Sequence, residues 1–500
     1  MNTLLDLIQN APGDKTAIIL PESRFTISYD SLRAQVAEVA DILASAGIQP
    51  GDRVAMALPN CLDTVVCFIA ASIAGTAAPL NPGYRYDEFL FYLEDTNAKV
   101  LILPVEGGLD ARRAAAERGI PVLTSDVVAP GRVVITPSAT TRKAPAPSPD
   151  DIALILHTSG STGRPKRVPL RHRNLAVSAQ NIVDTYHLGA TDVALVAMPL
   201  FHVHGLMAST MATLLSGGTI IVPPKFNPLS FWRTVRERGA TWYSAVPTIH
   251  SLLLSRAGTE RPDGAQNLRF IRSCSAPLSP EMMHRMEAVF GVPVLEAYGM
   301  TEASHQMSSN PLPPGSRRAG SVGPGTGVKI GIMDEAGNLL AAGQAGEVVI
   351  QGPNVIDGYE NNPEANKTSF TNGWFRTGDQ GVLDAGGYLT LIARIKELIN
   401  RGGEKVSPVE VDEVLLAHPA VAEAVSFAVP HPTWGEEVSA AVVLKEGAAA
   451  TEGEILTFCK EKLAEFKRPK TIHITQQIPR GATGKIQRRT MAATFAGDSR

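Results

Sequence analysis

Residues 157–166 read His-Thr-Ser-Gly-Ser-Thr-Gly-Arg-Pro-Lys and follow an apolar run at 152–156 that is typical of a buried strand. The stretch gathers hydroxyl side chains, glycines and a lysine into one loop. Glycine lets backbone amides approach an anion closely, and hydroxyl, amide and ammonium groups donate to phosphate oxygens. The loop therefore favours a polyphosphate. It differs from the common P-loop, because Lys166 lies three residues after Gly163 and is followed by Arg167, and a flexible surface turn is the alternative.

Strand and helix patterns alternate on both sides of this loop. A helix is expected from an N-cap at Asp30 or Ser31 to about residue 46. The Pro-, Ala-, Ser- and Thr-rich stretch 126–150 is expected to be a surface connection. This alternation of strand and helix patterns predicts a layered α/β fold with parallel strands. Further strands are expected at 194–198, 219–222, 242–247, 268–271 and 292–296.

The pattern changes in the second half of the chain. From residue 315 onward, glycine-rich turns separate short alternating strands such as 346–352, which indicates a β-rich subdomain. A second unit begins near residue 393, with a helix expected at 408–418 and strands at 421–428 and 438–444. We therefore predict an α/β fold with a large N-terminal domain at 1–392, made of layered α/β subdomains and a β-rich subdomain. A small C-terminal α+β domain follows at 393–500.

Composition narrows the class of protein. A chain of 500 residues is too long to form one compact core, so at least two domains are expected. Its composition, with 44% hydrophobic and 19% charged residues, is typical of a globular protein. A net charge of −3 gives no electrostatic case for a nucleic acid or membrane partner. Four cysteines without CxxC spacing disfavour disulfides and zinc, and no targeting segment is evident, so a cytoplasmic location is expected. The apolar run 65–80 is short for a membrane span and predicts a buried helix and strand.

Polar residues follow several expected strands, where open α/β sheets bind ligands. Thr301 and Glu302 suit a nucleotide phosphate and its Mg²⁺, because that ion prefers hard oxygen ligands, although a capped helix start is the alternative. The carboxylate of Asp379 suits the two hydroxyls of a ribose. Lys485 follows a glycine on a loop that can reach into a cleft, and a solvated surface lysine is the alternative.

In order and over nearly the whole chain, these motifs resemble those of the adenylate-forming superfamily of acyl-CoA synthetases. The resemblance implies two half-reactions: a carboxylate attacks the α-phosphate of ATP to give acyl-AMP and diphosphate, and CoA then displaces AMP. ATP, Mg²⁺ and CoA are thus expected. The matching motifs are 159–166, 298–302, 377–379, 394–397 and 484–485.

The resemblance also implies roles for individual residues. Lys485, Thr301 and Glu302 are expected to be catalytic, with Glu302 holding Mg²⁺, and the small domain is expected to rotate about a hinge at Lys396. CoA is expected at Lys225, Gly402 and Gly403. The expected ATP and AMP contacts are Thr158, Ser159, Gly160, Ser161, Thr162, Lys166, Ala276, Pro277, Glu296, Ala297, Tyr298, Thr301, Asp379, Arg394 and Lys485.

The acyl pocket of the superfamily corresponds here to His204, Ser275 and His305, all polar. Burying unpaired polar groups against an alkyl chain costs roughly 2 kcal/mol or more. A short, doubly charged acid satisfies them instead. The surrounding stretches 273–276, 296–311 and 396–405 closely resemble the oxalate–CoA ligases of plants and fungi, which implies oxalate as the acid.

Three alternatives stay open, as does the oligomeric state. The nearest is another short-chain, medium-chain or aromatic acyl-CoA ligase. An amino-acid adenylation domain would need a carboxylate near Phe201, where this chain has His202 and His204. A binding protein that has lost catalysis is disfavoured by the presence of Glu302 and Lys485.

Overall fold

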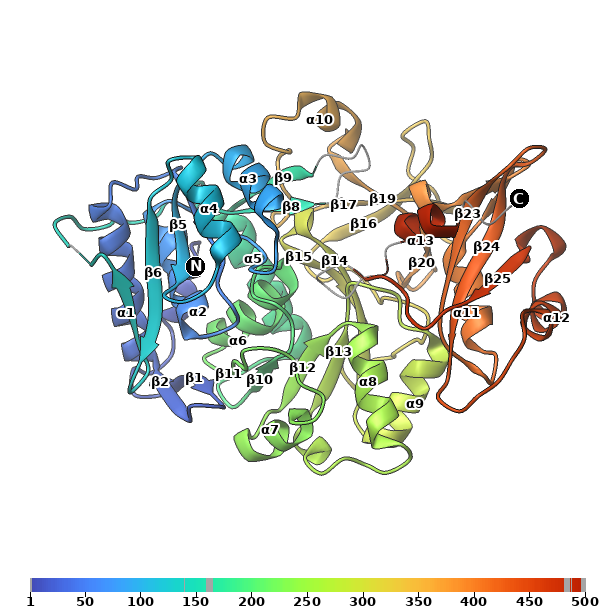
Figure 1. Ribbon diagram of the computed structural model, residues 1–500, viewed down its shortest axis with the longest axis horizontal. Helices are drawn as coiled ribbons and strands as arrows, with labels where there is room; N and C mark the ends of the chain where they lie inside the picture. Colours follow the sequence, from blue (N-terminus) through green and yellow to red (C-terminus); the bar gives the residue numbers. More distant parts are fainter. Residues whose placement is uncertain (1, 139, 159–164, 481–485, 487, 496–500) are drawn as a thin grey trace.

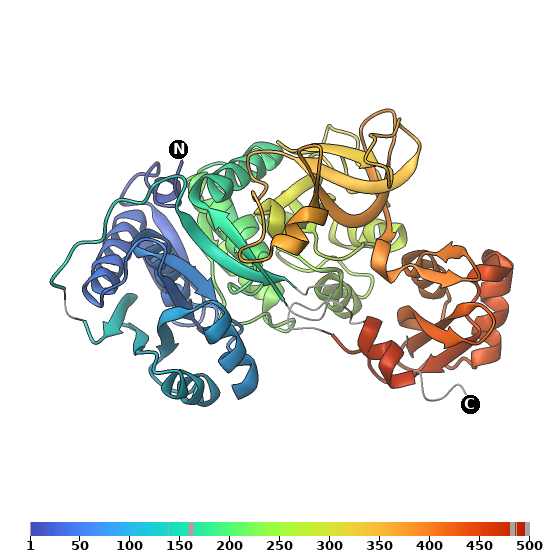
Figure 2. The same cartoon turned by 90° about the horizontal axis from the view of Figure 1, so that it is seen from above.

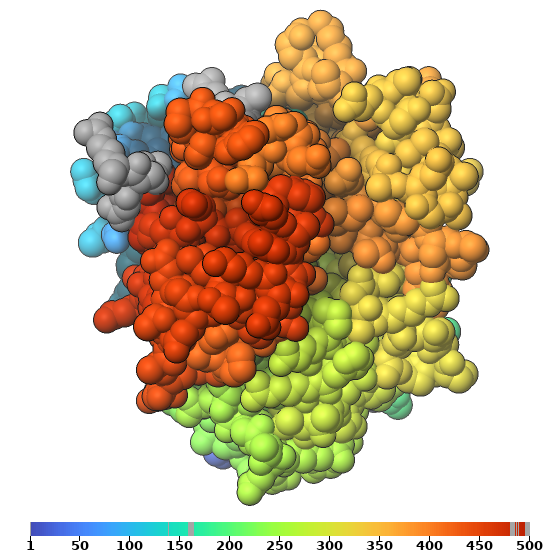
Figure 3. All heavy atoms as spheres, turned by 90° about the vertical axis from the view of Figure 1, so that its right-hand side faces the viewer, coloured from blue at the N-terminus to red at the C-terminus, as the bar shows by residue number. Residues whose placement is uncertain are grey.

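The structure is a computed structural model that describes residues 2–138, 140–158, 165–480, 486 and 488–495 (Figure 1). Its described strands form four sheets, three of them in the large N-terminal part of the chain. Seen from above, the last sheet and its helices stand at one end of the molecule (Figure 2). From that end, they lie in front of parts of the segments coloured green and yellow (Figure 3).

The first sheet carries the predicted adenine and acyl residues. Its order is β15-β14-β13-β12-β10-β11-β1-β2, and its strands run parallel except for the two edges, β2 and β15. The carboxyl ends of β13 and β14 therefore open at the edge where such sheets bind ligands. The bounds are β1 Thr16–Leu20, β2 Phe25–Ser28, β10 Val193–Val196, β11 Thr219–Ile221, β12 Trp242–Ala245, β13 Phe270–Ser273, β14 Val294–Met300 and β15 His305–Ser309.

The second sheet carries the predicted phosphate loop. Its order is β7-β6-β5-β3-β4-β8-β9, again parallel within and antiparallel at both edges. The loop joins β8 to β9, the antiparallel pair at one edge. The bounds are β3 Arg53–Met56, β4 Thr76–Pro79, β5 Ala98–Pro104, β6 Val122–Val128, β7 Arg132–Thr136, β8 Ile152–Thr158 and β9 Lys166–Arg171.

Helices pack between and around these sheets (Figure 1). Every residue of α2 is buried, as expected of a helix whose residues are mostly apolar. One continuous core includes residues of the first sheet and of β8 and β9, the strands that flank the predicted phosphate loop. The α-helices are α1 Tyr29–Ser45, α2 Leu62–Ala74, α3 Tyr86–Asp95, α4 Leu109–Glu117, α5 His172–Tyr186, α6 Ala212–Leu215, α7 Phe231–Arg238, α8 Pro247–Ala257, α9 Pro280–Phe290, α10 Pro363–Ser369, α11 Pro408–Leu416, α12 Glu452–Lys462 and α13 Arg488–Phe495. The π-helix η2 spans His204–Met211, and the short 3₁₀ segments are η1 Asp6–Ile8, η3 Ala265–Asn267, η4 Thr301–Ala303, η5 Ile395–Glu397 and η6 Glu465–Lys467.

The third and fourth sheets follow the predicted change of pattern. The third is the β-rich subdomain, and the fourth belongs to the C-terminal part, where α11 to α13 accompany it. The α/β class and the segregated α+β end are confirmed, and the boundary at residue 392 stays a prediction. The third sheet comprises β16 Lys329–Met333, β17 Ala345–Gln351, β18 Phe370–Thr371, β19 Trp374–Leu383 and β20 Leu389–Arg394. The fourth comprises β21 Ile399–Arg401, β22 Glu404–Val406, β23 Val421–His431, β24 Gly435–Leu444 and β25 Thr471–Ile474.

Two local predictions are wrong. Helix α1 begins earlier than predicted, because the side chain of Ser28 accepts a hydrogen bond from the Ser31 amide and acts as the N-cap. The stretch 126–150 is not all loop, because β7 pairs with the end of β6. The apolar run 65–80 falls on α2 and β4, as predicted, and no described helix combines the length and apolar character needed to cross a membrane.

Candidate active site

The predicted phosphate loop connects β8 and β9, which are paired with each other. Thr158 and Lys166 face each other at the open end of the β8–β9 pair. The predicted residues between them, Ser159, Gly160, Ser161 and Thr162, lie outside the described residues, as does Lys485.

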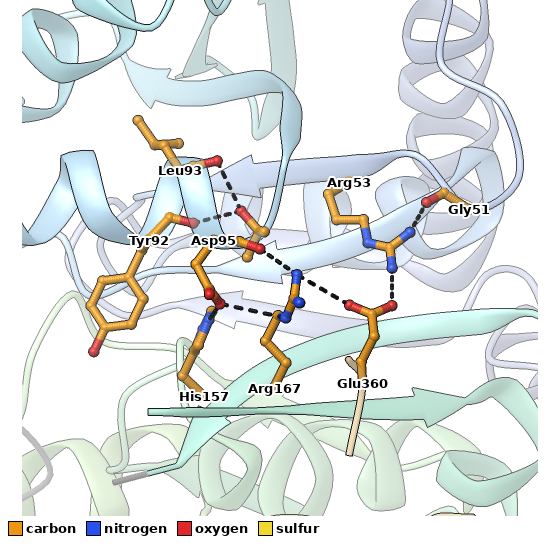
Figure 4. A network of polar contacts seen from close by, with 9 residues as sticks. Gly51, Arg53, Tyr92, Leu93, Asp95, His157, Arg167 and Glu360 are labelled. Carbon is orange, nitrogen blue, oxygen red and sulfur yellow. Dashed lines mark hydrogen bonds and ion pairs between the residues drawn. The ribbon is translucent and has the colours of Figure 1, made fainter. Parts of the chain in front are cut away.

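Five charged or polar side chains hold the base of this loop, and we call them the loop-base network (Figure 4). His157 Nε2 lies 2.9 Å from Asp95 Oδ2, and Arg167 Nε lies 3.5 Å from the same oxygen. Arg167 also lies 3.5 Å from Glu360, which pairs with Arg53. Burial lowers the pKa of His157, and Asp95 opposes that shift. The network joins α3, β3, β8 and β9 to the segment before α10.

The predicted phosphate, metal and hinge residues share one electrostatic environment. The Tyr359 hydroxyl donates to Glu302 Oε1 at 2.7 Å, and Lys166 Nζ stands 4.3 Å from the centre of the Tyr359 ring. Burial lowers the pKa of Lys166, Glu302 opposes this shift and Lys396 adds to it. Burial and the nearby Glu302 raise the pKa of Tyr359. Tyr359 is thus a site residue that no sequence motif indicated.

A second cluster surrounds the predicted ribose ligand. Asp379 on β19 pairs in register with Arg394 on β20, and Arg394 Nε lies 2.9 Å from Asp379 Oδ1. The other carboxylate oxygen accepts from the Tyr298 hydroxyl. Attraction to Asp379 raises the pKa of Arg394, while burial raises that of Tyr298, with Asp379 adding to the shift. The buried carboxylate is therefore held in one orientation by its two partners.

The remaining residues that are predicted to bind the nucleotide lie at the ends of two adjacent strands. Ala276 and Pro277 follow β13, whereas Ala297 lies in β14 and Thr301 begins η4 directly after it. Glu296 ties the two ends together, because its Oε1 accepts from the Leu278 amide at 2.9 Å. Its Oε2 is buried with no hydrogen-bond partner among the described residues, and burial raises the pKa of this carboxyl to about 8.

The predicted CoA residues lie in two places. Gly402 and Gly403 form the turn between β21 and β22 in the C-terminal part, and both adopt positive φ angles that favour glycine. Lys225 is exposed on the connection between β11 and α7. Lys396, the predicted hinge, is exposed in η5, directly after the third sheet ends.

The three predicted acyl residues come together. His204 Nδ1 lies 3.0 Å from Ser275 Oγ, and the rings of His204 and His305 stack with their centres 5.0 Å apart. Ser275 has φ +73° and His305 has φ +114°, values that are rare outside glycine. Such backbone strain persists only where the surroundings impose it, and it is concentrated at functional sites.

Sequence reasoning missed an arginine that lies close to His204. Arg272 on β13 is fully buried, and no carboxylate of the described residues forms an ion pair with it. Its guanidinium donates to the hydroxyls of Tyr186 at 2.8 Å and Ser244 at 3.0 Å and to Gln306 Oε1 at 3.1 Å. The available signal was a charge within an apolar run, which escaped notice because the strand was predicted to end at residue 271.

The carboxylate of Glu302 suits a magnesium ion that arrives with ATP. Among the described residues, no group of three or more His, Cys, Asp or Glu side chains could enclose a metal. Magnesium commonly binds through one or two carboxylates together with substrate phosphates. A single buried Glu302, beside Lys166 and at the end of β14, suits that arrangement.

Comparison with known proteins identifies the class. A model of the AMP-binding enzyme family matches residues 6–360, and one of the AMP-binding enzyme C-terminal domain matches 410–485. The chain belongs to the AMP-binding enzyme family. The predicted class of adenylate-forming acyl-CoA synthetase, with ATP, Mg²⁺ and CoA, is thereby confirmed.

Individual relatives cover the full chain. The oxalate–CoA ligase of Arabidopsis thaliana is 46% identical over 99% of both chains. The oxalate–CoA ligase of Saccharomyces cerevisiae is 42% identical over 98% of this chain and 96% of its own. Among solved structures, ATP-bound MatB from Rhodopseudomonas palustris matches 100% of both chains at 33% identity and a TM-score of 0.92, and its apo form gives 0.80.

Proposed function

We propose that this acyl-CoA synthetase is an oxalate–CoA ligase, which converts oxalate, ATP and CoA to oxalyl-CoA, AMP and diphosphate. The observation that carries the proposal is the polar cluster of the buried His204 and His305 with the partly buried Ser275, beside the buried Arg272, which forms no ion pair among the described residues. A buried charge without a counter-ion is costly, and a substrate anion offsets that cost. The names of the two full-length relatives support the same acid.

The geometry disfavours a fatty acid. An alkyl chain beside this cluster accepts no hydrogen bond from the Ser275 hydroxyl, and a polar group left unsatisfied costs roughly 1–3 kcal/mol. Oxalate has no alkyl part, so its binding energy comes from hydrogen bonds and charge. One carboxylate reacts, and the other accepts hydrogen bonds from the polar residues of the acyl site.

In the first half-reaction, an oxygen of the reacting carboxylate attacks the α-phosphorus of ATP. The bond from that phosphorus to the bridging oxygen breaks, and diphosphate leaves. We assign the β- and γ-phosphates to the loop at 158–166 and the ribose to Asp379, held by Tyr298 and Arg394. Lys485 is assigned to the developing charge at the transition state. Glu302 would hold the Mg²⁺ that arrives with ATP, and the ion would supply positive charge to the phosphates.

In the second half-reaction, the CoA sulfur attacks the acyl carbon of oxalyl-AMP. The bond between that carbon and the phosphate-bound oxygen breaks, AMP leaves with the oxygen, and the thiol proton passes to solvent. We propose that the small domain, 393–500, rotates about Lys396 between the two half-reactions. The rotation moves Lys485 away from the reaction centre and brings Gly402 and Gly403 to it.

Substrate preference tests the proposal. AMP formation is measured with ATP and CoA for oxalate, malonate, glyoxylate, acetate, a medium-chain fatty acid and 4-coumarate. We expect kcat/KM for oxalate to exceed every other acid by at least about tenfold, a difference of about 1.4 kcal/mol. A monocarboxylic acid that equals or exceeds oxalate would refute the substrate assignment.

A further inference from the structure

We propose that Arg272 is a positioning residue that, through Ser244, fixes the proton of His204 on Nδ1 and so makes the Ser275 hydroxyl a donor to the acid substrate. The identity of that acid rests on the proposed function, but the position of the proton does not. The inference concerns a chain of hydrogen bonds that runs from a buried charge to the pocket, and we call Arg272, Ser244, His204 and Ser275 the relay.

The first link has a fixed direction. Ser244 on β12 pairs in register with Arg272 on β13, so the two side chains lie on the same face of the sheet. A guanidinium carries only donors and stays protonated in proteins. Arg272 Nη1 therefore donates to Ser244 Oγ at 3.0 Å, and the serine oxygen accepts.

The second link follows from the first. Ser244 Oγ lies 2.6 Å from His204 Nε2, and Arg272 Nη1 lies 3.5 Å from that same nitrogen. A proton on Nε2 would turn an N–H donor toward the guanidinium, and an imidazolium would place two buried positive charges side by side. Both are unfavourable in a site of low dielectric. Nε2 is therefore the acceptor, Ser244 donates to it, and His204 is neutral.

The third link reaches the pocket. A neutral histidine whose Nε2 accepts carries its proton on Nδ1. His204 Nδ1 lies 3.0 Å from Ser275 Oγ, so the histidine donates and the serine oxygen accepts. The Ser275 proton is then left for a third group, and Ser275 is only partly buried, which lets a ligand approach.

The result matches the chemistry of an anionic acid. An ionised carboxylate only accepts hydrogen bonds, so it needs a hydroxyl that donates. Without the charge of Arg272, Ser244 can instead accept from an Nε2 proton. Nδ1 would then accept from Ser275, and the serine would present lone pairs to the carboxylate. Arg272 thus decides whether Ser275 attracts or repels the substrate.

The position of the proton is directly measurable without substrate. Two-bond ¹H–¹⁵N correlation spectra of protein labelled at histidine distinguish the ring nitrogen that carries the proton, and His204→Gln assigns the signal. We expect Nδ1–H in the wild type and a shift toward Nε2–H in Arg272→Met, which removes the charge that faces Nε2. A proton on Nε2 in the wild type, or an unchanged tautomer in Arg272→Met, would overturn the proposal.

Kinetics separate positioning from mere packing. Arg272→Met should raise KM for the preferred acid by about tenfold, leave KM for ATP within about twofold, and lower the preference for that acid over acetate. Arg272→Lys keeps the positive charge and should restore most of the loss. Equal changes in KM for ATP and for the acid, or no rescue by Arg272→Lys, would contradict the relay. Failure of oxalate as substrate would refute the proposed function while leaving the tautomer result standing.

Discussion

His305 occupies a backbone conformation that few residues other than glycine adopt, and its ring stacks on that of His204. A β-branched residue at φ +114° would add strain of its own, so leucine, which is unbranched at Cβ, is the better replacement. His305→Leu should raise KM for oxalate roughly tenfold or more, because a hydrogen bond to a charged group contributes about 1.5–3 kcal/mol. KM for ATP should change little, and steady-state kinetics measure both.

The matched control for this change is His284→Leu, at an exposed histidine on α9. It should leave both KM values unchanged. Unaltered oxalate kinetics in His305→Leu would mean that His305 only packs against its neighbours.

Glu296 gives a pH-dependent prediction about stability. Burial raises the pKa of its carboxyl from 4.5 to about 8. Between these values the unfolded chain releases the proton and the folded chain retains it, so the free energy of unfolding falls as pH rises, by at most about 1.4 kcal/mol per pH unit. Glu296→Gln has no ionisable group at this position and so removes this decrease in the free energy of unfolding. Relative to wild type, the variant should therefore gain stability from about pH 4.5 to about pH 8, as measured by urea unfolding.

The exposed Glu281, on α9, offers the control substitution Glu281→Gln, which should leave the pH profile unchanged. A Glu296→Gln profile parallel to that of wild type would show that the carboxyl ionises freely in the folded protein.

Sequence reasoning could propose the acyl-site residues that lie in motifs, and it missed those that only contacts in the fold define. His204, Ser275 and His305 could be named because their motifs resemble known ones. Tyr359 could not, because its contact with Glu302 joins residues that lie 57 positions apart. Arg272 was hidden for a different reason, since its partners come from separate strands and helices that meet only in the fold.

At the scale of elements, the loop-base network fixes the two strands that bear the phosphate loop. Glu360 is central, because it pairs with both Arg167 and Arg53 and all three side chains are largely buried. Glu360→Gln removes the shared charge. We expect KM for ATP to rise about fivefold, equivalent to about 1 kcal/mol, with KM for oxalate within about twofold.

A substitution four positions away tests whether position matters. Glu364 forms an exposed ion pair with Lys367, and exposed pairs contribute little, so Glu364→Gln should leave KM for ATP unchanged. Equal effects of the two substitutions would show that the network does not hold the loop.

Element types were predictable where the apolar pattern was long, and their ends were less so. The strand at 152–156 was recognised, but β8 continues to Thr158 because β9 pairs with it to that point. The strand β7 alternates buried and exposed residues in the period of a half-buried strand, yet Pro, Gly and Ser on either side suggested a loop. Pairing with a partner strand decides such ends, and a single sequence does not reveal the partner.

At the scale of the whole molecule, we propose that the arrangement of the two domains links the two half-reactions. The ATP-bound and apo structures of MatB match the chain with different TM-scores, so that one protein has more than one shape. We therefore assign Lys485 and Lys396 to different steps. Lys485→Ala should slow oxalyl-AMP formation on the order of 10²-fold or more, because a preorganised charge is lost at the transition state. Conversion of supplied oxalyl-AMP to oxalyl-CoA should persist.

Lys396→Pro should give the reverse pattern. Proline fixes φ and removes an N–H, so the hinge loses its freedom to turn. Oxalate-dependent exchange of diphosphate into ATP should survive, while thioester formation collapses. If both variants lose both half-reactions equally, the division of roles between Lys485 and Lys396 is wrong.

The central claim is that a carboxylate of oxalate is activated as an adenylate before CoA attacks it, and oxygen transfer tests this most directly. Oxalate labelled with ¹⁸O in both carboxylates is supplied with ATP and CoA, and the masses of the products are measured by mass spectrometry. The attacking oxygen remains on phosphorus when the acyl–oxygen bond breaks, so the account predicts one ¹⁸O in AMP, none in diphosphate, and equal amounts of AMP and oxalyl-CoA. Label in diphosphate or orthophosphate, or oxalyl-CoA formed with unlabelled AMP, would contradict it.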